Sequence, residues 1–440
     1  MTQPWPVSTV GEQFEVHLGK MLDSARNVGF PKPYVGNRAV QWGWIDLSAV
    51  GVAPLTQSDI RRFRLRNGDL LVCEGGEIGR GAIWRDQLSE CYYQKALHRL
   101  RPKNGYDVRL MLALLEYWST GGVFPNYVTQ TSIAHLPRDK FIEMPLPLPS
   151  AAEQARIGEV IQDVNDLIHA LRRMIAKKQA IRQGLRQQLL TGRTRLPGYS
   201  GSWREVSLGR YVSYVNTVAL SRAQLDGESP VRYVHYGDIH ARDSPMLDAA
   251  REALPRASST LLRNAGRLKV GDLVFADVSE DPDGVGKSVE VTSVPDVGVV
   301  PGLHTIAARF EKAVLADGFK AYLQFVPSFR ETLHRLVVGT KVLATTRSLI
   351  SSITLTLPNV DEQRAIASIL TDADREIAVL RVRLAKARDV KQGMMQELLA
   401  GRTRLPGTGS TARPTWDDPG WRPSHVGLAR HGGWLVPGQA

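Results

Sequence analysis

Cysteine is nearly absent from this chain of 440 residues, which contains only Cys73 and Cys91. Two cysteines cannot form a disulfide framework in a chain of this length, so the composition favours a reducing cytoplasm, with both thiols in or near a core. Long apolar runs are also missing, because none approaches the roughly 18 residues of a membrane span. The first residues, MTQPWPVSTVGEQFEV, lack the basic start and the apolar stretch of a secretory signal. We therefore expect a cytoplasmic protein that does not contact a membrane.

The motifs of catalysis and of cofactor binding are missing as well. No phosphate-binding GxxxxGKS or GxxxxGKT is present, and the glycine-rich EGGEIGRG at 74–81 does not match GxGxxG. FPNY at 124–127 resembles the Asn-Pro-Pro-Tyr signature of adenine methyltransferases only superficially, because it lacks the paired prolines. The histidines show no metal-ligand spacing, and no nucleophile lies beside a candidate base. We therefore expect a chain that is not an enzyme and holds no metal or cofactor itself.

Positive charge, in contrast, is present in excess. Lys and Arg number 56 against 44 Asp and Glu, which gives a formal net charge of +12 at pH 7. This balance favours a polyanionic partner, because cations that neutralise phosphates release condensed counterions. The length suggests two to four folding units at roughly 100–200 residues per domain.

The chain contains an internal repeat at an offset of 209 residues. Residues 148–198 align with residues 357–407 without a gap, and 23 of the 51 pairs are identical. The match includes Glu153-Gln154 with Glu362-Gln363, and it ends at GRTRLPG in both copies. A fainter match precedes each copy, where VHLGKML (16–22) resembles VSLGRYV (206–212) and RLRNGDLLVCEG (64–75) resembles RLKVGDLVFADV (267–278). The sequence is therefore a duplication in which a variable module precedes a well-matched segment of about 50 residues.

Each matched segment is predicted to be one long helix of about 38 residues. Ser150 and Asn359 are expected N-caps of capping boxes, and Gly192 and Gly401 are expected helix stops. Apolar residues recur at alternating steps of four and three, which is the period of a coiled-coil seam. The seam residues are Ile157, Ile161, Val164, Ile168, Leu171 and Ile175 in the first copy, and Ile366, Leu370, Ala373, Ile377, Leu380 and Leu384 in the second.

The charge order along the two helices favours antiparallel pairing within one chain. Both helices begin with mostly acidic residues and continue with mostly basic ones, so an antiparallel pair sets acidic ends against basic ends. Such a pair would give the duplicated molecule a pseudo-twofold axis, which suits a divided DNA site because twofold proteins read half-sites at fixed spacing. The alternative is that each helix docks separately on its own module.

We predict an α+β protein with two small mixed domains and two long helices. The strand-like runs are 69–75, 81–84 and 272–278, the further helices are 108–118 and 319–337, and the runs 141–149 and 350–358 are extended exits toward the long helices. The predicted segments are module 1 at 1–149, the first spacer helix at 150–198, module 2 at 199–358, the second spacer helix at 359–407 and a tail at 408–440 that is either disordered or packed locally.

Candidate DNA contacts are cationic and polar residues in the predicted loops and strand ends of the modules. Arginine pairs with guanine and Asn or Gln with adenine in the major groove, although any one such residue is more often solvated surface or a phosphate contact than a base reader. The candidates are Arg61, Arg62, Arg64, Lys95, His98, Arg99, Asn126, Tyr127, Gln130 and Thr131 in module 1, and His304, Lys341, Thr345, Thr346 and Arg347 in module 2.

The doubled motifs resemble those of the specificity subunits of type I restriction-modification systems. The junctions LPLPSAAEQARI (146–157) and LTLPNVDEQRAI (355–366), the endings LLTGRTRL and LLAGRTRL, and the pairs GDLLV with GDLVF and VHLGK with VSLGR carry the resemblance, which covers about residues 10–407. The tail from 408 to 440 departs from the family pattern.

The resemblance implies a role and a set of partners. Each module would be a target recognition domain for one half of an asymmetric, interrupted site in double-stranded DNA, and the helices would fix the gap. The chain would dock two methyltransferase subunits and, with them, restriction subunits. Those partners would use S-adenosylmethionine, ATP and Mg²⁺, whereas this chain would be non-catalytic. The alternatives are a coiled-coil scaffold whose modules bind proteins, and a stand-alone nuclease or methyltransferase, which the missing motifs disfavour.

Overall fold

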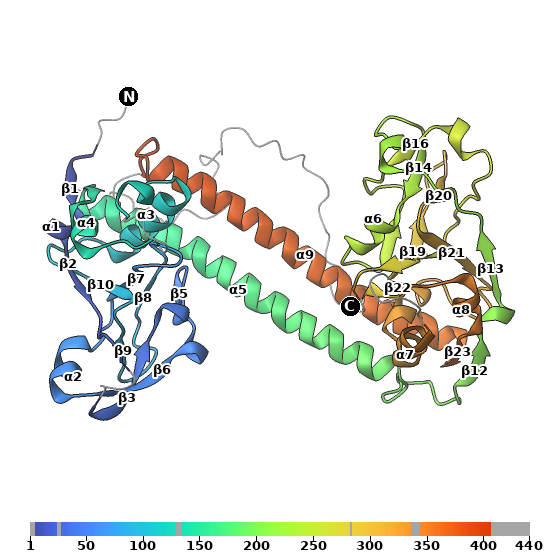
Figure 1. The fold of residues 1–440 in the computed structure, drawn as a ribbon, viewed down its shortest axis with the longest axis horizontal. Helices are drawn as coiled ribbons and strands as arrows, with labels where there is room; N and C mark the ends of the chain where they lie inside the picture. Colours follow the sequence, from blue (N-terminus) through green and yellow to red (C-terminus); the bar gives the residue numbers. More distant parts are fainter. Residues whose placement is uncertain (1–4, 24–27, 129–133, 282–283, 337–342, 406–440) are drawn as a thin grey trace, which may run out of the picture. The chain divides into compact units, whose positions relative to one another are not determined.

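The computed structural model describes residues 5–23, 28–128, 134–281, 284–336 and 343–405. Contacts within the chain divide it into two compact units. Unit 1 consists of residues 1–166 and 389–440, and unit 2 of residues 167–388. Two helices of 39 residues, α5 (Ala151–Leu189) and α9 (Val360–Leu398), each contribute one part to each unit (Figure 1). The predicted tail lies outside the described residues.

Unit 1 contains module 1, which is built on a four-stranded antiparallel sheet in the order β2-β10-β7-β8. A three-stranded sheet (β6-β3-β9) and the two-stranded pairs β1-β11 and β4-β5 complete its β-structure in the described residues. The strands are β1 Val7–Thr9, β2 Phe14–Leu18, β3 Phe30–Val35, β4 Val40–Gln41, β5 Trp44–Ile45, β6 Gly51–Leu55, β7 Leu70–Cys73, β8 Gly81–Ile83, β9 Tyr92–Tyr93, β10 Leu97–Pro102 and β11 Pro145–Pro147. The helices are α1 Val10–Gln13, α2 Gln57–Phe63, α3 Val108–Thr120 and α4 Arg138–Glu143.

The main core of unit 1 joins one face of the four-stranded sheet to α3 and to both long helices. Leu70, Ile83 and Leu110 share this core with Ile157 of α5 and Leu398 of α9. A second core, on the side of the three-stranded sheet, contains Tyr92, Tyr93 and both cysteines. Burial raises the pKa of each thiol to about 11, so Cys73 and Cys91 behave as small apolar core residues.

Unit 2 contains module 2, whose main sheet has five strands in the order β13-β21-β17-β19-β15. A three-stranded sheet (β16-β14-β20) and the pairs β12-β23 and β18-β22 accompany it. The strands are β12 Arg204–Ser207, β13 Val212–Val215, β14 Val231–Val234, β15 Met246–Asp248, β16 Arg256–Ala257, β17 Leu273–Ala276, β18 Val278–Ser279, β19 Ser288–Ser293, β20 Val299–Pro301, β21 Thr305–Phe310, β22 Leu343–Ala344 and β23 Thr354–Leu357. The helices are α6 Tyr236–His240, α7 Pro327–Leu336 and α8 Arg347–Ser352, with short 3-10 helices that include η4 Leu208–Arg210 and η8 Lys320–Phe325.

The two modules share one frame around the repeated Gly-Asp. Asp69 is 1% exposed and accepts two hydrogen bonds of 2.8 Å from the guanidinium of Arg101. Asp272 is also 1% exposed and accepts bonds of 2.8 and 2.6 Å from Arg309. Each aspartate also accepts a backbone N–H at the turn before its strand. These carboxylates are therefore fully used in holding the turn to the sheet, and the repeated Gly-Asp is a structural signature.

The predicted match between VHLGK and VSLGR is wrong in its register. VHLGK lies on β2 and its end, in the main sheet of module 1, whereas VSLGR spans β12 and η4. The residue that corresponds to Leu208 is Val10, because the N–H of Val10 donates to Met144 and that of Leu208 donates to Ile353 at the same point of the fold. VSLGR therefore corresponds to the STVG that precedes β2, and its Leu-Gly lies at a different place in the fold from that of VHLGK.

Other predicted elements differ from the structure at their ends. The predicted helix at 319–337 is η8 followed by α7, with Pro327 opening the second helix because proline cannot donate to the preceding turn. The predicted extended exits begin with short helices, α4 and α8, and only their last residues form the strands β11 and β23.

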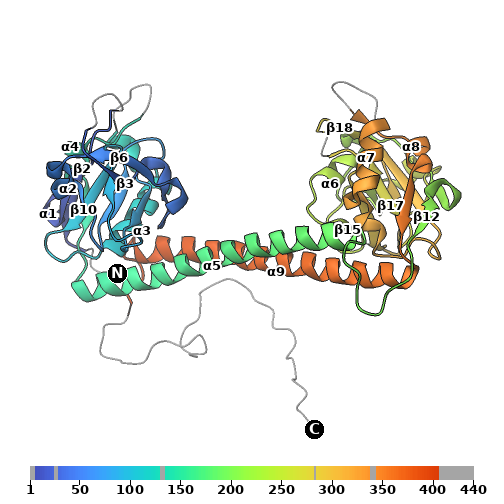
Figure 2. The ribbon, with the colours of Figure 1, turned by 90° about the horizontal axis from the view of Figure 1, so that it is seen from below.

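The long helices pack against each other in antiparallel order, as predicted, so separate docking on the modules is excluded (Figures 1 and 2). In unit 2, Lys178 donates to Glu376 at 2.6 Å and Arg182 to Asp374 at 2.7 Å. Ala373 is half-buried. The other predicted seam residues are each exposed by 9% or less, namely Ile157, Ile161, Val164, Ile168, Leu171, Ile175, Ile366, Leu370, Ile377, Leu380 and Leu384. Neither these helices nor any other in the described ranges is long and apolar enough to cross a membrane.

Candidate nucleic-acid interface

The central strand of each module ends at an acidic residue in the same backbone setting. Glu74 follows β7. Its backbone N–H donates to the carbonyl of Ala96 at 3.0 Å, and its backbone carbonyl accepts from the N–H of Leu136 at 2.8 Å. Asp277 follows β17. Its backbone N–H donates to the carbonyl of His304 at 3.1 Å, and its backbone carbonyl accepts from the N–H of Thr345 at 2.7 Å. These bonds make Glu74 and Asp277 equivalent. We call the strand end at each acid, with the loops that meet there, the acid edge of the module.

The acid edge of module 1 places Lys95 and His135 beside Glu74. Lys95 is exposed, and both His135 and Lys95 favour the ionised form of the Glu74 carboxyl, but burial dominates and raises its pKa. The backbone at the strand end approaches the histidine closely, because a Cβ on Gly75 would lie 2.9 Å from Nδ1 of His135. Glycine at this position therefore lets the imidazole lie against the strand end, next to the acid.

The acid edge of module 2 holds a carboxylate–histidine pair. Nδ1 of His304 lies 3.2 Å from Oδ1 of Asp277, and burial raises the pKa of this carboxyl despite the neighbouring imidazole. His304 has a φ of 53°, a left-handed conformation that is uncommon outside glycine and carries a conformational cost. The surrounding hydrogen bonds therefore hold the histidine at a defined place beside the acid.

An aromatic cluster adjoins this pair. The ring of Tyr236 meets the ring of His304 edge-on at 5.4 Å, and it also lies 6.1 Å from His240 and 4.5 Å from His235. His240 is fixed by a 2.8 Å bond between Nε2 and the carbonyl of Val278. Burial lowers the pKa of His235, so at neutral pH its Nδ1 can accept the N–H of Gly237, which caps α6. The cluster offers flat rings and imidazole nitrogens, which suit contact with bases.

Several predicted DNA contacts lie at or beside the acid edges. Asn126 is exposed in the 3-10 helix η3 (Phe124–Asn126), next to the half-buried Tyr127. This loop lies against the turn that follows Glu74, because a Cβ on Gly79 would lie 2.3 Å from the ring of Phe124.

In module 2, the segment that follows β22 reaches the acid edge. Thr345 is only 5% exposed and contributes its backbone N–H to Asp277. Thr346 caps α8 through a 3.2 Å bond from Leu349, and the exposed Arg347 lies 5.4 Å from the ring of Tyr214. Arg347 remains a prediction as a DNA contact. The predicted contacts Gln130, Thr131 and Lys341 lie outside the described residues.

His98 and Arg99 must be withdrawn as candidate DNA contacts. Both lie on β10, an interior strand of the sheet between β2 and β7, and they are 0% and 5% exposed. Nε2 of His98 is 2.9 Å from the carbonyl of Leu136, and burial lowers its pKa to about 4. The guanidinium of Arg99 lies 3.4 Å from Glu15. Neighbouring residues of a strand point to opposite faces, so both faces of β10 are covered here, which a run of mixed polar residues does not reveal.

Arg61, Arg62 and Arg64 are exposed, but they lie on another part of module 1. The first two are in the last turn of α2, and Arg64 follows that helix and bridges to Tyr92 of β9. These arginines therefore accompany the three-stranded sheet and remain predictions as phosphate contacts.

Sequence reasoning missed the role of the arginines in GRTRLPG. Arg195, at the end of the first copy, donates to both carboxylate oxygens of Glu362 at 2.6 and 2.7 Å. Arg404, at the end of the second copy, donates to Glu153 at 2.5 Å. Each closing arginine thus pairs with the opening glutamate of the other copy. The repeat of both motifs was the available signal, but it does not reveal which copy pairs with which.

The ends of the two copies also share a tryptophan and a glutamine anchor. The guanidinium of Arg195 lies 5.8 Å from the ring of Trp203, and that of Arg404 lies 4.7 Å from the ring of Trp5. The glutamine that follows each glutamate bonds its own module, for example through the 2.9 Å bond from Ala316 to Gln363. Within each unit, these contacts connect the end of one repeat copy, the start of the other copy and the module.

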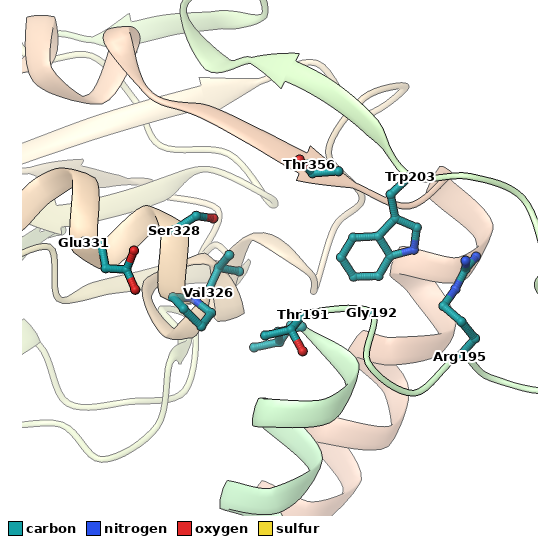
Figure 3. A pocket seen from close by; sticks show the side chains of 10 residues that line it. Thr191, Gly192, Arg195, Trp203, Val326, Ser328, Glu331 and Thr356 are labelled. Carbon is teal, nitrogen blue, oxygen red and sulfur yellow. The ribbon is translucent and has the colours of Figure 1, made fainter.

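A cavity of about 470 Å³ opens beside the Arg195 joint in unit 2 (Figure 3). Trp203 forms one wall, and Val326 and Glu331 lie on the opposite side (Figure 3). No group of His, Cys, Asp and Glu in the described ranges could hold a metal ion.

Known proteins resemble this chain in sequence and in fold. The model of the family described as type I restriction modification DNA specificity domain matches residues 2–180. The protein named as the specificity subunit of the type I restriction enzyme MjaX of Methanocaldococcus jannaschii is 24% identical over 429 residues, which cover 92% of this chain and 94% of that protein. The MjaVIII specificity subunit of the same organism is 22% identical over 294 residues, covering 62% of this chain and 66% of its own length.

A solved structure shows the same fold. The crystal structure of the S subunit of a type I restriction-modification system from M. genitalium matches with a TM-score of 0.59 and 12% identity, and the match covers 90% of this chain and 96% of that chain. At this identity the likeness concerns the fold alone.

Proposed function

We propose that this chain, which belongs to the specificity subunits of type I restriction-modification systems, reads an interrupted DNA site with its two modules. As a DNA specificity subunit it selects the target for a complex, and the finer proposal is that each module reads one half of that target at its acid edge. The observation that carries this proposal is the pair of equivalent edges with different surroundings. Glu74 has Lys95 and His135 beside it, whereas Asp277 has His304. A shared frame with different edge residues supports two half-sites of different sequence.

We propose further that α5 and α9 fix the number of base pairs between the half-sites. Each helix has 39 residues and takes part in both units, and charged pairs such as Arg182 with Asp374 set the register of the two helices. One heptad of helix is about 10.5 Å long, which corresponds to roughly three base pairs of DNA. Changes of helix length should therefore translate into changes of the gap.

The proposed partners are double-stranded DNA, two methyltransferase subunits and restriction subunits. In this arrangement the methyltransferase subunits use S-adenosylmethionine, and the restriction subunits use ATP and Mg²⁺. The chain contributes target choice and docking. The ion pairs of Arg195 with Glu362 and of Arg404 with Glu153 give each unit the same arrangement at its helix ends. This repetition supports two docking positions.

The proposal is tested by expressing the chain with its methyltransferase subunit in a host free of other adenine methylation. Sequencing of modified bases should return one motif with two specified segments and a fixed unspecified gap. Binding to that motif should weaken steeply with salt, because phosphate contacts release counterions. Methylation without a divided motif would contradict the proposal. Affinity for proteins that ignores both salt and DNA would instead favour the scaffold alternative.

A further inference from the structure

The acids at the two module edges are in an unexpected place for a DNA-binding surface. We propose that Glu74 and Asp277 are base-reading residues, each of which accepts a hydrogen bond from an exocyclic amino group, with N4 of cytosine as the partner. This inference rests on the proposed function and names the chemistry by which each module selects its half-site.

The two acids differ from the structural acids of the same strands. Asp69 and Asp272 begin these strands and use both oxygens to bind an arginine. Glu74, at the other end of β7, has no side-chain hydrogen bond to any described residue, and its neighbours act on it only through their charge. Asp277 shares Oδ1 with His304, and no described residue hydrogen-bonds its Oδ2. Each edge acid therefore keeps acceptor capacity that the fold does not use.

The backbone at both acids is held in place although their side chains keep this unused capacity. Two backbone bonds fix each acid, one to the residue just before the neighbouring strand and one from the segment just before the next helix. In module 2, the strained backbone of His304 places the imidazole that orients the carboxylate. The carboxylate of Asp277 therefore has a direction set by His304 and one free oxygen, which suits it to read one donor at one position.

Because phosphates repel carboxylates, an acid that made no contact with a base would only weaken DNA binding at this edge. A carboxylate on a DNA-facing edge weakens binding unless it gains a donor from the DNA, and yet both modules carry one at the same position. In module 1, the charge of the exposed Lys95 acts on Glu74 and offsets part of this repulsion.

The half-sites should still differ. Glu74 is one methylene longer than Asp277, and Ala96 occupies the position of His304 in the backbone frame. The same acceptor chemistry thus operates at a different reach and with different neighbours. We expect one amino-bearing base to be specified by each module.

The experiment compares methylation motifs of the full chain with Glu74→Gln and Asp277→Asn, each co-expressed with the methyltransferase subunit in a host free of other adenine methylation. The amide removes one acceptor site and adds donors, so Asp277→Asn should cut the preference for the base at one position at least tenfold and leave the other half-site unchanged. Glu74→Gln should do the same in the other half-site. Asp277→Glu and Glu74→Asp keep the acceptor and should retain the preferred base with weaker discrimination.

Asp86→Asn and Asp296→Asn are matched controls, because each removes one exposed acid from the opposite end of the sheet. Asp86 follows β8 and Asp296 follows β19, and both strands run antiparallel to the central strand. These controls should leave the motif unaltered. An unchanged motif in Glu74→Gln and Asp277→Asn, whether or not their melting temperature falls, would overturn the inference. If the wild-type chain itself gives no divided motif, the proposed function fails before the variants are compared.

Discussion

The two modules share a backbone arrangement, but the side chains packed beside their central strands differ. They are apolar in module 1 and include a buried charged pair in module 2. Ile83 pairs with Leu70 in module 1 and lies in the apolar core with α3. At the equivalent position of module 2, Glu290 pairs with Leu273 and is 1% exposed. The carboxylate of Glu290 accepts two backbone N–H groups of the η8 region and lies 3.7 Å from Nζ of the fully buried Lys320. The two modules therefore share their backbone and their Gly-Asp turn, while the side chains of their cores differ in chemistry.

The largest expected effect comes from breaking the buried charges of module 2. Lys320→Met should lower the free energy of unfolding by about 3–5 kcal/mol, because Glu290 would remain buried without a counter-charge. Urea unfolding of the full chain measures this change. Nζ of Lys320 also donates to Asp317 at 2.5 Å. Lys312→Met is the matched control, since Lys312 pairs with the same Asp317 at 2.6 Å but its side chain is 61% exposed.

The double variant Lys320→Met with Glu290→Ile sharpens the comparison by copying module 1. It should recover most of the stability that Lys320→Met alone removes, because both buried charges are replaced together. Equal destabilisation in the single and double variants would show that module 2 cannot accept the apolar filling of module 1.

The next effect concerns His98, whose equivalent in module 2 is the apolar Ile306. Burial lowers the pKa of His98 to about 4, so the unfolded chain binds the proton first as the pH falls. Stability is full above the unfolded pKa of about 6.5 and should decline by roughly 2 kcal/mol between pH 7.5 and pH 5. His98→Leu should flatten this decline in urea unfolding. The exposed His334 provides the control variant His334→Leu, and an equal flattening in both variants would contradict the assignment.

A smaller difference is expected between the two helix-end joints. The side chain of Glu362 is 1% exposed, whereas that of Glu153 is 26% exposed. Arg195→Met should therefore lower the melting temperature more than Arg404→Met, because it leaves the more buried carboxylate without its partner. Thermal melting of the two variants compares them directly, and a larger decrease in Arg404→Met would reverse the expected order.

The smallest effect is expected from the arginines of α2. If they bind phosphates, Arg61→Gln with Arg62→Gln should reduce the slope of log affinity against log salt by about 0.9 for each phosphate that is no longer neutralised. The methylated motif should not change, which separates these cations from the edge acids. A changed motif would place α2 at the bases.

The parts of the fold that depend on local periodicity were predictable. The seam from Ile157 to Ile175 repeats at 3.5 residues, and the order of charges along the helices predicted the antiparallel direction that the pair of Arg182 and Asp374 shows. The helix stops at Gly192 and Gly401 have φ values of 70° and 66°, as a left-handed C-terminal glycine requires.

The parts that depend on distant partners were not predictable. A capping box was expected at Asn359, but Glu362 directs both oxygens to Arg195 of the other copy. Arg99 and His98 looked like surface cations because a single strand does not reveal which sheet covers it. The match of RLRNGDLLVCEG with RLKVGDLVFADV already places Glu74 opposite Asp277, but the sequence does not reveal that loops from far along the chain, through Leu136 and Thr345, meet at these acids.

The central claim is that each module reads its own half-site, and a module replacement tests it most directly. In this variant, residues 1–149 replace residues 199–358, and the chain is expressed with its methyltransferase subunit before modified bases are sequenced. We expect a symmetric motif in which the half-site of module 1 occurs twice in inverted orientation, with an unspecified gap. Retention of the original asymmetric motif would contradict the account, because specificity would then not reside in the modules.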